Sequence, residues 1–474
     1  LHMVEPAGNE GESDDATDGA PRTVTHVVLA FGERPDDGMS NFRTGDIVLL
    51  YPYRPGDEPD VRRTMVFRAT LTDVRDGHIR LTLRAEQTDA RVFTMHHGAL
   101  WAIEHDFMEA SFAPLYLSTR HFLTAPQERR DLLMMQRRPR TDASLRLRGC
   151  YGDFDTLTLR ARQARDFFLI VGPPGTGKTS FGLVNTLREE LHDAEASVLL
   201  MAYTNRAVDE ICSKLAEADL PFIRLGGAAV CPAPYRRHLL GEQAMAAASL
   251  TAMKAVLQRT PIIVGTTTAV TASAALFAVK HFTLAIIDEA SQILEPHILT
   301  PLSATHEGRP AIDRFVLIGD HKQLPAVVQQ TARESRVEDA ALRDIGLTDC
   351  RLSLFERLLH RYGDDPAVCY TLTRQGRMHR DIALFPNMAF YGGRLQTVPL
   401  PHQERPLPPI DATAMAPAEV LLLSHRVLFM DVPLPPVAVS DKVNTTEAAI
   451  IAAIVARMQR RMGTAFVPQQ SVGI

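Results

Sequence analysis

A glycine-rich stretch that ends in a lysine and a threonine has the residue types needed to bind phosphate. In order it reads Gly172, Pro173, Pro174, Gly175, Thr176, Gly177, Lys178 and Thr179, which matches the spacing G-x-x-x-x-G-K-[ST]. The glycines let the backbone curl so that successive N–H groups point at an anion. Lys178 would reach the β- and γ-phosphates of a nucleotide, and the Thr179 hydroxyl would bind Mg²⁺.

The flanking residues predict a strand before this stretch and a helix after it. The apolar run 167–171 is typical of a buried strand, and Phe181, Val184, Leu187 and Leu191 recur at helical spacing. A helix that begins here turns the positive end of its dipole toward the bound anion. The alternative is a loop rich in glycine and proline that caps a helix and binds nothing.

An acidic pair, Asp288-Glu289, follows another apolar run, 282–287. Neighbouring residues at a strand end point in different directions, so the two carboxylates can have different tasks. Asp288 would hold Mg²⁺ together with Thr179, and Glu289 would polarise the attacking water. The alternative is an acidic pair that caps the following helix.

Apolar strands and helical stretches alternate from residue 145 to residue 327, which predicts a parallel sheet with helices on both faces. Four strands stand out, at 167–171, 198–202, 282–287 and 315–318, and each ends in a polar turn. Ligands bind at the carboxyl ends of such strands, so the four turns should converge on one crevice. In the last turn, the Gln323 amide could sense the γ-phosphate and Asp320 could join the same network.

Two further strand-end turns carry small polar residues that suit a phosphodiester backbone. They are Thr204-Asn205 and Thr266-Thr267-Thr268. Hydroxyl and amide groups beside free backbone N–H groups can grip such a backbone without reading its bases. The alternative is that both are ordinary polar turns that cap helices.

The net charge does not decide whether the chain binds nucleic acid. It is −5 over 474 residues, but the first twenty residues hold six carboxylates and no Lys or Arg, so the remainder is close to neutral. A near-neutral body can carry a basic groove, because binding follows the local potential. No apolar run reaches eighteen residues, no secretory signal begins the chain, and the five cysteines lie far apart. We therefore expect a cytoplasmic protein without a zinc or iron–sulfur site.

The residues before the sheet predict three further regions. Residues 1–22 are acidic and aperiodic, so we expect a disordered lead-in. Several short strand patterns predict a small β-barrel over 23–105, and helical spacing predicts a stalk over 106–145. The stalk ends in a basic cluster, 137–140, which is either a phosphate contact or, more often for such runs, a solvated surface. The sheet domain itself is placed at 146–350.

Six segments, in this order and at these spacings, resemble the superfamily 1 helicases. They are GPPGTGKT (172–179), AYTNRAVDEI (202–211), GTTTA (265–269), IIDEASQ (286–292), LIGDHKQLPAVV (317–328) and TRQGRMHRDIALFPNMAFYGGRL (373–395). They look most like the branch that includes the RNA helicase of nonsense-mediated decay and the nuclease-helicase that trims Okazaki flaps. The barrel and the stalk also look like those of this branch.

The resemblance implies two RecA-like domains of the P-loop NTPase fold, the second represented in part by residues 351–474. It implies an enzyme that hydrolyses ATP with Mg²⁺ and moves 5′→3′ on single-stranded nucleic acid, DNA favoured over RNA, unwinding duplex. Gln323 matches the γ-phosphate sensor. Arg377 matches the arginine that reaches from the second domain to the γ-phosphate and stabilises the charge of the transition state. The alternative for Arg377 is an ion pair with a local carboxylate.

The chain departs from the family pattern at three places. Gln163 lies closer to the glycine-rich stretch than the family's adenine-recognising glutamine, and Gly376 stands where the family often has an aromatic residue. The chain also stops before the family's last motifs, so we expect it to be part of a longer protein. Residues 429–432 and 440–448 resemble the family's next strand and helix.

Two other functions are compatible with parts of the sequence. One is an ATP-gated clamp that binds nucleic acid without processive unwinding, as a module of a larger nuclease, repair or defence protein. An ATPase stimulated by single strands, without strand separation, would indicate that clamp. The other is a small-molecule kinase, which the GDHKQLP and QGRMH segments do not suit.

Overall fold

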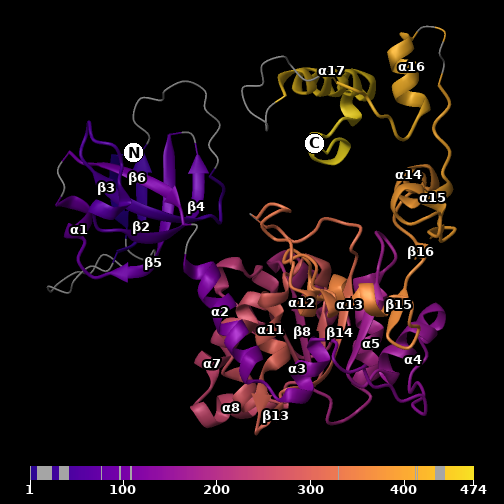
Figure 1. The fold of residues 1–474 in the computed structure, drawn as a ribbon. Coiled ribbons are helices and arrows are strands. Elements are labelled where there is room, and N and C mark those ends of the chain that lie inside the picture. Colours follow the sequence, from indigo (N-terminus) through magenta and orange to yellow (C-terminus); the bar gives the residue numbers. More distant parts are fainter. Residues whose placement is uncertain are drawn as a thin grey trace. The chain divides into compact units, whose positions relative to one another are not determined.

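The computed structural model contains two compact units (Figure 1). The first unit comprises residues 1–133, 267–281 and 295–311, and the second comprises 134–266, 282–294 and 312–474. The structure describes residues 2–7, 24–30, 42–75, 77–95, 98–106, 109–328, 330–410, 413, 415–432 and 444–473. Within these ranges, no helix is both long and apolar enough to cross a membrane.

The first unit contains an antiparallel sheet of six strands in the order β1-β2-β5-β4-β3-β6. The strands are β1 (His2–Ala7), β2 (Val24–Ala30), β3 (Ile47–Tyr53), β4 (Phe67–Arg75), β5 (His78–Gln87) and β6 (Leu100–His105). Alternate residues such as Leu29, Leu50 and Leu81 are buried together with Trp101 in one core. Among the described strands β1 and β6 are the two edges, so the expected small barrel is a half-barrel.

Strand β1 corrects part of the prediction for the lead-in. His2–Ala7 pairs with β2 although residues 1–22 were expected to be disordered, and residues 8–23 lie outside the described residues. The acidic composition of residues 1–22 did not predict this strand, because a short edge strand needs few apolar residues of its own.

The stalk predicted over 106–145 is not one continuous helix. Helix α2 (Glu109–Thr124) ends before Pro126, and α3 (Gln127–Leu133) begins after it. Proline lacks the N–H that would continue the helical ladder, and it disfavours helical backbone at the residue before it. Helix α2 packs on α11 (Glu295–Ser303), where the buried Ser118 and Thr300 hydroxyls form a 2.6 Å hydrogen bond.

The second unit is built on a parallel sheet of seven strands in the order β15-β7-β14-β11-β8-β10-β9. Its strands are β7 (Phe167–Val171), β8 (Val198–Ala202), β9 (Phe222–Arg224), β10 (Ile262–Thr266), β11 (Phe282–Ile287), β14 (Ile312–Gly319) and β15 (Cys369–Thr371). Every ladder between them is parallel, which confirms the predicted fold class. The four strands expected from the sequence are all present.

Helices cover the sheet because successive strand residues point to opposite faces. Phe168 packs with α4 (Asp155–Gln163), α5 (Val184–Glu190) and α6 (Asn205–Glu217) in one buried cluster. Phe167 faces the other way, where its ring meets Tyr362 of α13 (Leu354–Tyr362) edge-on. Helix α13 and strand β15 therefore pack with this sheet, although both lie beyond residue 350, where the second domain is predicted to begin. Leu372 still donates its N–H to Val171 O at 2.8 Å.

Further described elements follow Leu372. They are β16 (Arg374–Gln375), α14 (Arg380–Phe390), β17 (Gln396–Thr397), α15 (Pro401–Glu404), α16 (Pro417–Ser424), α17 (Thr445–Met462) and α18 (Pro468–Ser471). The helix expected near residue 445 is present as α17. The strand expected at 429–432 is not formed in the described residues, because no neighbouring strand pairs with it, and Phe429 is exposed.

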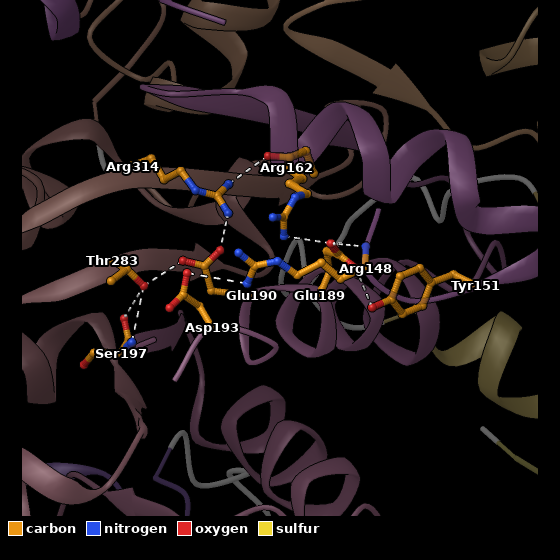
Figure 2. Close-up of polar contacts among 10 residues, drawn as sticks. Arg148, Tyr151, Arg162, Glu189, Glu190, Asp193, Ser197, Thr283 and Arg314 are labelled. Carbon is orange, nitrogen blue, oxygen red and sulfur yellow. Dashed lines mark hydrogen bonds and ion pairs between the residues drawn. The ribbon is translucent and has the colours of Figure 1, made fainter. Parts of the chain in front are cut away.

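A polar network fixes the carboxyl end of α5 at the amino ends of the strands, which is the edge opposite the predicted crevice (Figure 2). Glu190 accepts a hydrogen bond from Thr283 of β11 at 2.6 Å and pairs with Arg314 of β14, which also donates to Ala161 O at 2.8 Å. Its neighbour Glu189 accepts hydrogen bonds from Arg148 N, Gly149 N, Tyr151 Oη and Arg162. Helix α5 is thus held at the end remote from the glycine-rich turn.

Two arginines of the basic cluster at 137–140 anchor this segment to the buried Asp166, whereas the Arg138 side chain is 86% exposed, as the solvated-surface alternative expects. The guanidinium groups of Arg137 and Arg140 both bind the carboxylate of Asp166, at 2.7 Å and 2.9 Å, just before β7 begins. Asp166 is 2% exposed. Burial by itself would raise the pKa of Asp166, but the hydrogen bonds from Arg137 and Arg140 outweigh it and hold that pKa well below its usual range.

Replacing Asp166 with asparagine should lower the free energy of unfolding by about 3 kcal/mol at pH 7. This value lies at the lower end of the range for breaking a buried ion pair, because the Arg140 side chain is largely exposed and its pairing is screened by water. A carboxylate with a depressed pKa stabilises the fold above its unfolded pKa, ordinarily 3.8, and loses this contribution as the pH falls toward its folded pKa. The difference between wild type and Asp166→Asn should therefore shrink below about pH 4 in urea titrations. The exposed Asp344→Asn is the matched control. Equal stability of wild type and Asp166→Asn at pH 7 would contradict the anchor.

Candidate nucleotide site

The strand ladders bring the predicted polar turns to one edge of the sheet. Gly319 of β14 pairs with Val171 of β7, and Ile287 of β11 pairs with Leu317 of β14. The turns that begin at Gly172, Asp288 and Asp320 therefore lie side by side. This confirms the convergence expected from the sequence.

The turn after β7 has the geometry of a phosphate-binding loop. Gly175 and Gly177 have φ angles of +75° and +77°, which non-glycine residues rarely adopt. The Thr176 hydroxyl donates to Pro173 O at 2.7 Å and closes the turn from within. A helical turn begins directly at Lys178, so its first N–H groups face the loop. Strand, loop and helix all have the predicted order.

Two contacts join this loop to the acidic pair. The Thr179 hydroxyl donates to the Asp288 carboxylate at 2.6 Å, and Lys178 Nζ lies 2.7 Å from Glu289 Oε1. The two acidic residues therefore face different partners, as predicted from their adjacent positions. In particular, Asp288 lies beside Thr179 and not on another rim of the fold.

Asp288 is suited to a divalent cation. Its carboxylate is 2% exposed, and burial is the main reason that its pKa is raised to about 6, while the hydrogen bond from Thr179 acts in the opposite sense. A buried carboxylate that carries an incompletely balanced charge favours a nearby cation. Mg²⁺ is bound by oxygen ligands and usually by one or two carboxylates together with substrate phosphates. The oxygens of Thr179 and Asp288 fit this ion.

Glu289 has a backbone conformation that is unusual for its residue type. Its φ is 51°, in the left-handed region, although it is not a glycine. Such strain persists only where the surrounding structure enforces it, and it is concentrated at functional sites. Here the Glu289 N–H donates to Asp288 Oδ1 at 2.9 Å and its carboxylate accepts from Gln292 at 3.3 Å. The strained turn thus points the carboxylate at the phosphate-binding loop.

Asp320 and Gln323 form one network at the end of β14, as the sequence suggested. Gln323 Nε2 donates to Asp320 Oδ2 at 2.8 Å, and the Asp320 N–H donates to Ser291 Oγ at 3.1 Å. A third side chain, Tyr391, was not predicted to take part. Its hydroxyl donates to the same Asp320 oxygen at 2.7 Å. No local signal links residues 71 positions apart, so sequence reasoning missed Tyr391.

Arg377 lies at the phosphate-binding loop. The Gly376 N–H donates to Gly175 O at 2.9 Å, and a Cβ built on Gly175 would lie 2.5 Å from Arg377 Cβ. Within the described residues the guanidinium makes no hydrogen bond or ion pair, so the local pairing considered as an alternative is not seen. The buried Gln375 shapes this turn, because its Oε1 accepts from the N–H groups of Arg377 and Met378 at 3.0 and 2.8 Å.

The proposed nucleic-acid turns differ from one another in exposure. Thr204 caps α6 by accepting from Ala207 N at 3.2 Å, as the alternative allowed, and Asn205 beside it is exposed. Thr266 ends β10 and is half-buried. The Thr267 side chain is only 1% exposed, so it cannot contact a nucleic-acid strand at the surface. The next residue, Thr268, is the exposed one. The sequence spacing did not distinguish these two positions.

Gln163 is not available to a base. Its amide donates to the carbonyl groups of Ala143 and Leu145 at 3.3 and 3.1 Å, and so it fixes the segment before α4. This agrees with the spacing argument that separated it from an adenine-recognising glutamine.

Comparisons with known proteins place these features in a family. One family model, described as an AAA domain, matches residues 155–244 and 235–331. A second model, also described as an AAA domain, matches residues 350–474. The DNA replication ATP-dependent helicase/nuclease DNA2 of Xenopus laevis is 35% identical over 239 residues, which is 50% of this chain and 20% of that protein. The DNA replication ATP-dependent helicase/nuclease JHS1 of Arabidopsis thaliana is 28% identical over 395 residues, 79% of this chain and 27% of that protein.

The chain therefore spans about a quarter or less of the length of these relatives. Among solved structures, Arterivirus nonstructural protein 10 (helicase) is 14% identical with a TM-score of 0.32, covering 79% of this chain and 58% of that chain. That likeness is too weak for a detailed comparison of the folds.

Proposed function

The chain belongs to the superfamily 1 helicases, and on that premise we propose that it couples ATP hydrolysis to 5′→3′ movement along single-stranded DNA, unwinding duplex ahead of it. The observation that supports this most directly is the pairing of Thr179 with Asp288 and of Lys178 with Glu289 around one phosphate-binding loop. DNA is favoured over RNA because the DNA replication helicase/nucleases are among the relatives of the chain.

In this proposal each residue has one task at the triphosphate. The loop N–H groups and Lys178 bind the β- and γ-phosphates, and Thr179 and Asp288 hold Mg²⁺, which neutralises charge developing on the phosphates. Glu289 accepts a proton from the attacking water. Gln323 senses the γ-phosphate, and Arg377 stabilises the charge of the transition state.

Nucleic acid would be held by the exposed parts of the polar turns. The exposed Asn205 offers its amide to phosphates, Thr204 orients it by capping α6, and the half-buried Thr266 is a second candidate contact at the end of β10. Binding of this kind does not read bases. The proposal therefore predicts affinity with little sequence preference and a strong dependence on salt.

Glu289→Gln should leave ATP binding intact and reduce turnover about 100-fold, because the amide keeps the shape of the side chain but cannot accept a proton. ATP binds no more weakly than in wild type, since Lys178 loses an anionic partner that competes with phosphate. Binding is measured with a fluorescent ATP analogue, and turnover by phosphate release. The matched control is Glu210→Gln on α6, which should change neither quantity. A large loss of binding in Glu289→Gln would contradict the role of general base.

The proposed function is tested by ATPase activity with and without single-stranded oligonucleotides, and by unwinding of duplexes with either a 5′ or a 3′ tail. Stimulation by DNA with unwinding from the 5′ tail is the expected result. Stimulation without unwinding would support the ATP-gated clamp, and stronger stimulation by RNA would reverse the preference for DNA. An ATPase indifferent to any polynucleotide would contradict both.

A further inference from the structure

We propose that Tyr391 is a positioning residue that couples the placement of Arg377 to the orientation of Gln323. The proposal rests on the proposed function, since it assigns a task within the same ATPase site. The role proposed for Tyr391 does not require contact with the nucleotide. It acts through Asp320, to which both Tyr391 and Gln323 donate.

The carboxylate of Asp320 is buried and its oxygens are divided among three donors. Oδ2 accepts from the Tyr391 hydroxyl at 2.7 Å and from Gln323 Nε2 at 2.8 Å, while Oδ1 accepts from Lys322 N at 3.0 Å. Asp320 is 1% exposed and Tyr391 is 8% exposed, so water cannot readily replace the phenolic donor. Loss of one donor to a buried carboxylate is costly and shifts its remaining partners.

The network determines which atom of the Gln323 amide faces the site. A carboxylate only accepts hydrogen bonds, so the amide nitrogen must face Asp320 and the Gln323 oxygen points elsewhere. That oxygen can accept a hydrogen bond from a water molecule beside the γ-phosphate, whereas a rotated amide would present donors. The orientation of Gln323 is thus set by a residue that itself needs Tyr391.

Tyr391 and the turn that contains Arg377 lie at opposite ends of the same helix. Helix α14 is capped at its start by His379, two residues after Arg377, and at its end by Tyr391, whose N–H donates to Asn387 O at 3.1 Å. At the start of this element Gly376 bonds to Gly175 of the phosphate-binding loop, and at its end Tyr391 bonds to Asp320. The element therefore contacts the first RecA-like sheet at two points.

The contact of Gly376 with Gly175 and that of Tyr391 with Asp320 together couple the position of Arg377 to the orientation of Gln323. When the Arg377 turn lies against Gly175, Tyr391 lies against Asp320 and Gln323 is oriented for catalysis. If the element withdraws, Asp320 loses a donor and Gln323 loses its fixed orientation at the same time as Arg377 leaves the γ-phosphate. Hydrolysis is then confined to the state in which both residues are in place.

Tyr391→Phe removes only the hydroxyl and should reduce the kcat of ATP hydrolysis stimulated by single-stranded DNA about tenfold. A tenfold loss is about what one hydrogen bond to a charged group is expected to contribute. Affinity for an ATP analogue should stay within about twofold of wild type. The matched control is Tyr362→Phe, a buried tyrosine whose ring packs on Phe167. It should keep wild-type turnover. A double-mutant cycle with Asp320→Asn separates coupling from general damage, because loss of a shared bond makes the two effects on kcat less than additive.

Hydrogen exchange of the amides at 320–324 provides a readout that does not depend on turnover. With an ATP analogue bound, exchange there should rise in Tyr391→Phe and stay unchanged in Tyr362→Phe. The assignment of Tyr391 would be overturned if hydrogen exchange at 320–324 were unchanged in Tyr391→Phe and, in addition, either its kcat equalled that of wild type or its effect on kcat added to that of Asp320→Asn. If wild type itself lacks strand-stimulated ATPase, the proposed function fails, and the exchange experiment alone decides whether Tyr391 orders the 320–324 segment.

Discussion

Lys178→Ala should reduce ATP turnover about 1,000-fold and weaken nucleotide binding, which makes it one of the two largest effects that we expect. The Lys178 side chain is 14% exposed, and its Nζ lies 2.7 Å from Glu289 Oε1 beside the glycine-rich turn, so alanine removes the cation that this loop places at the phosphates. Binding is measured with a fluorescent ATP analogue, and turnover by phosphate release in the presence of single-stranded DNA.

Lys214→Ala is the matched control for this experiment. Lys214 lies on α6 and pairs with Glu217 at 2.8 Å, away from the strand-end turns, so its removal should change neither binding nor turnover. A Lys178→Ala protein that hydrolyses ATP at more than a tenth of the wild-type rate would show that the loop does not bind the reacting phosphates.

Arg377→Ala should spare nucleotide binding and reduce turnover about 1,000-fold or more, the range reported for arginines that stabilise the transition state of phosphoryl transfer. The buried Gln375 and Gln403 hold the turn through backbone groups, so the fold of the turn survives loss of the Arg377 side chain. The same two assays apply. Arg380→Ala, an exposed arginine at the start of α14, is the control and should retain turnover.

The contrast between Lys178→Ala and Arg377→Ala is more informative than either variant alone. If both weakened binding by the same factor, Arg377 would be a ground-state ligand of the nucleotide and not a residue specific to the transition state. If Arg377→Ala changed neither nucleotide binding nor turnover, Arg377 would have no role in catalysis despite its position beside Gly175.

The features that could be predicted from the sequence are those fixed by neighbours along the chain. A five-residue apolar run followed by G-x-x-x-x-G-K-T specifies strand, loop and helix together, and the run before Asp288 specifies the next strand end. Since parallel strands end at one edge, the meeting of Thr179 with Asp288 followed from these local patterns alone.

The features that could not be predicted depend on contacts between distant residues or on small rotations of the backbone. Asp166 pairs with both Arg137 and Arg140, so part of a cluster expected at the surface anchors the segment before β7. Thr267 and Thr268 are equivalent in the sequence pattern, but only one is exposed. Strand β15 is three residues long, too short for a periodic signal, and so its pairing with β7 was not predicted.

The ion pair between Lys178 and Glu289 has a consequence for the end of the catalytic cycle. The lysine can exchange one anionic partner for another, and a triphosphate competes for it better than a diphosphate because it carries more charge. Once the γ-phosphate has departed, Glu289 can recapture Lys178 and weaken the hold of the loop on ADP. Glu289, which we propose activates the water, would then also promote product release, and the site would be reset for the next ATP.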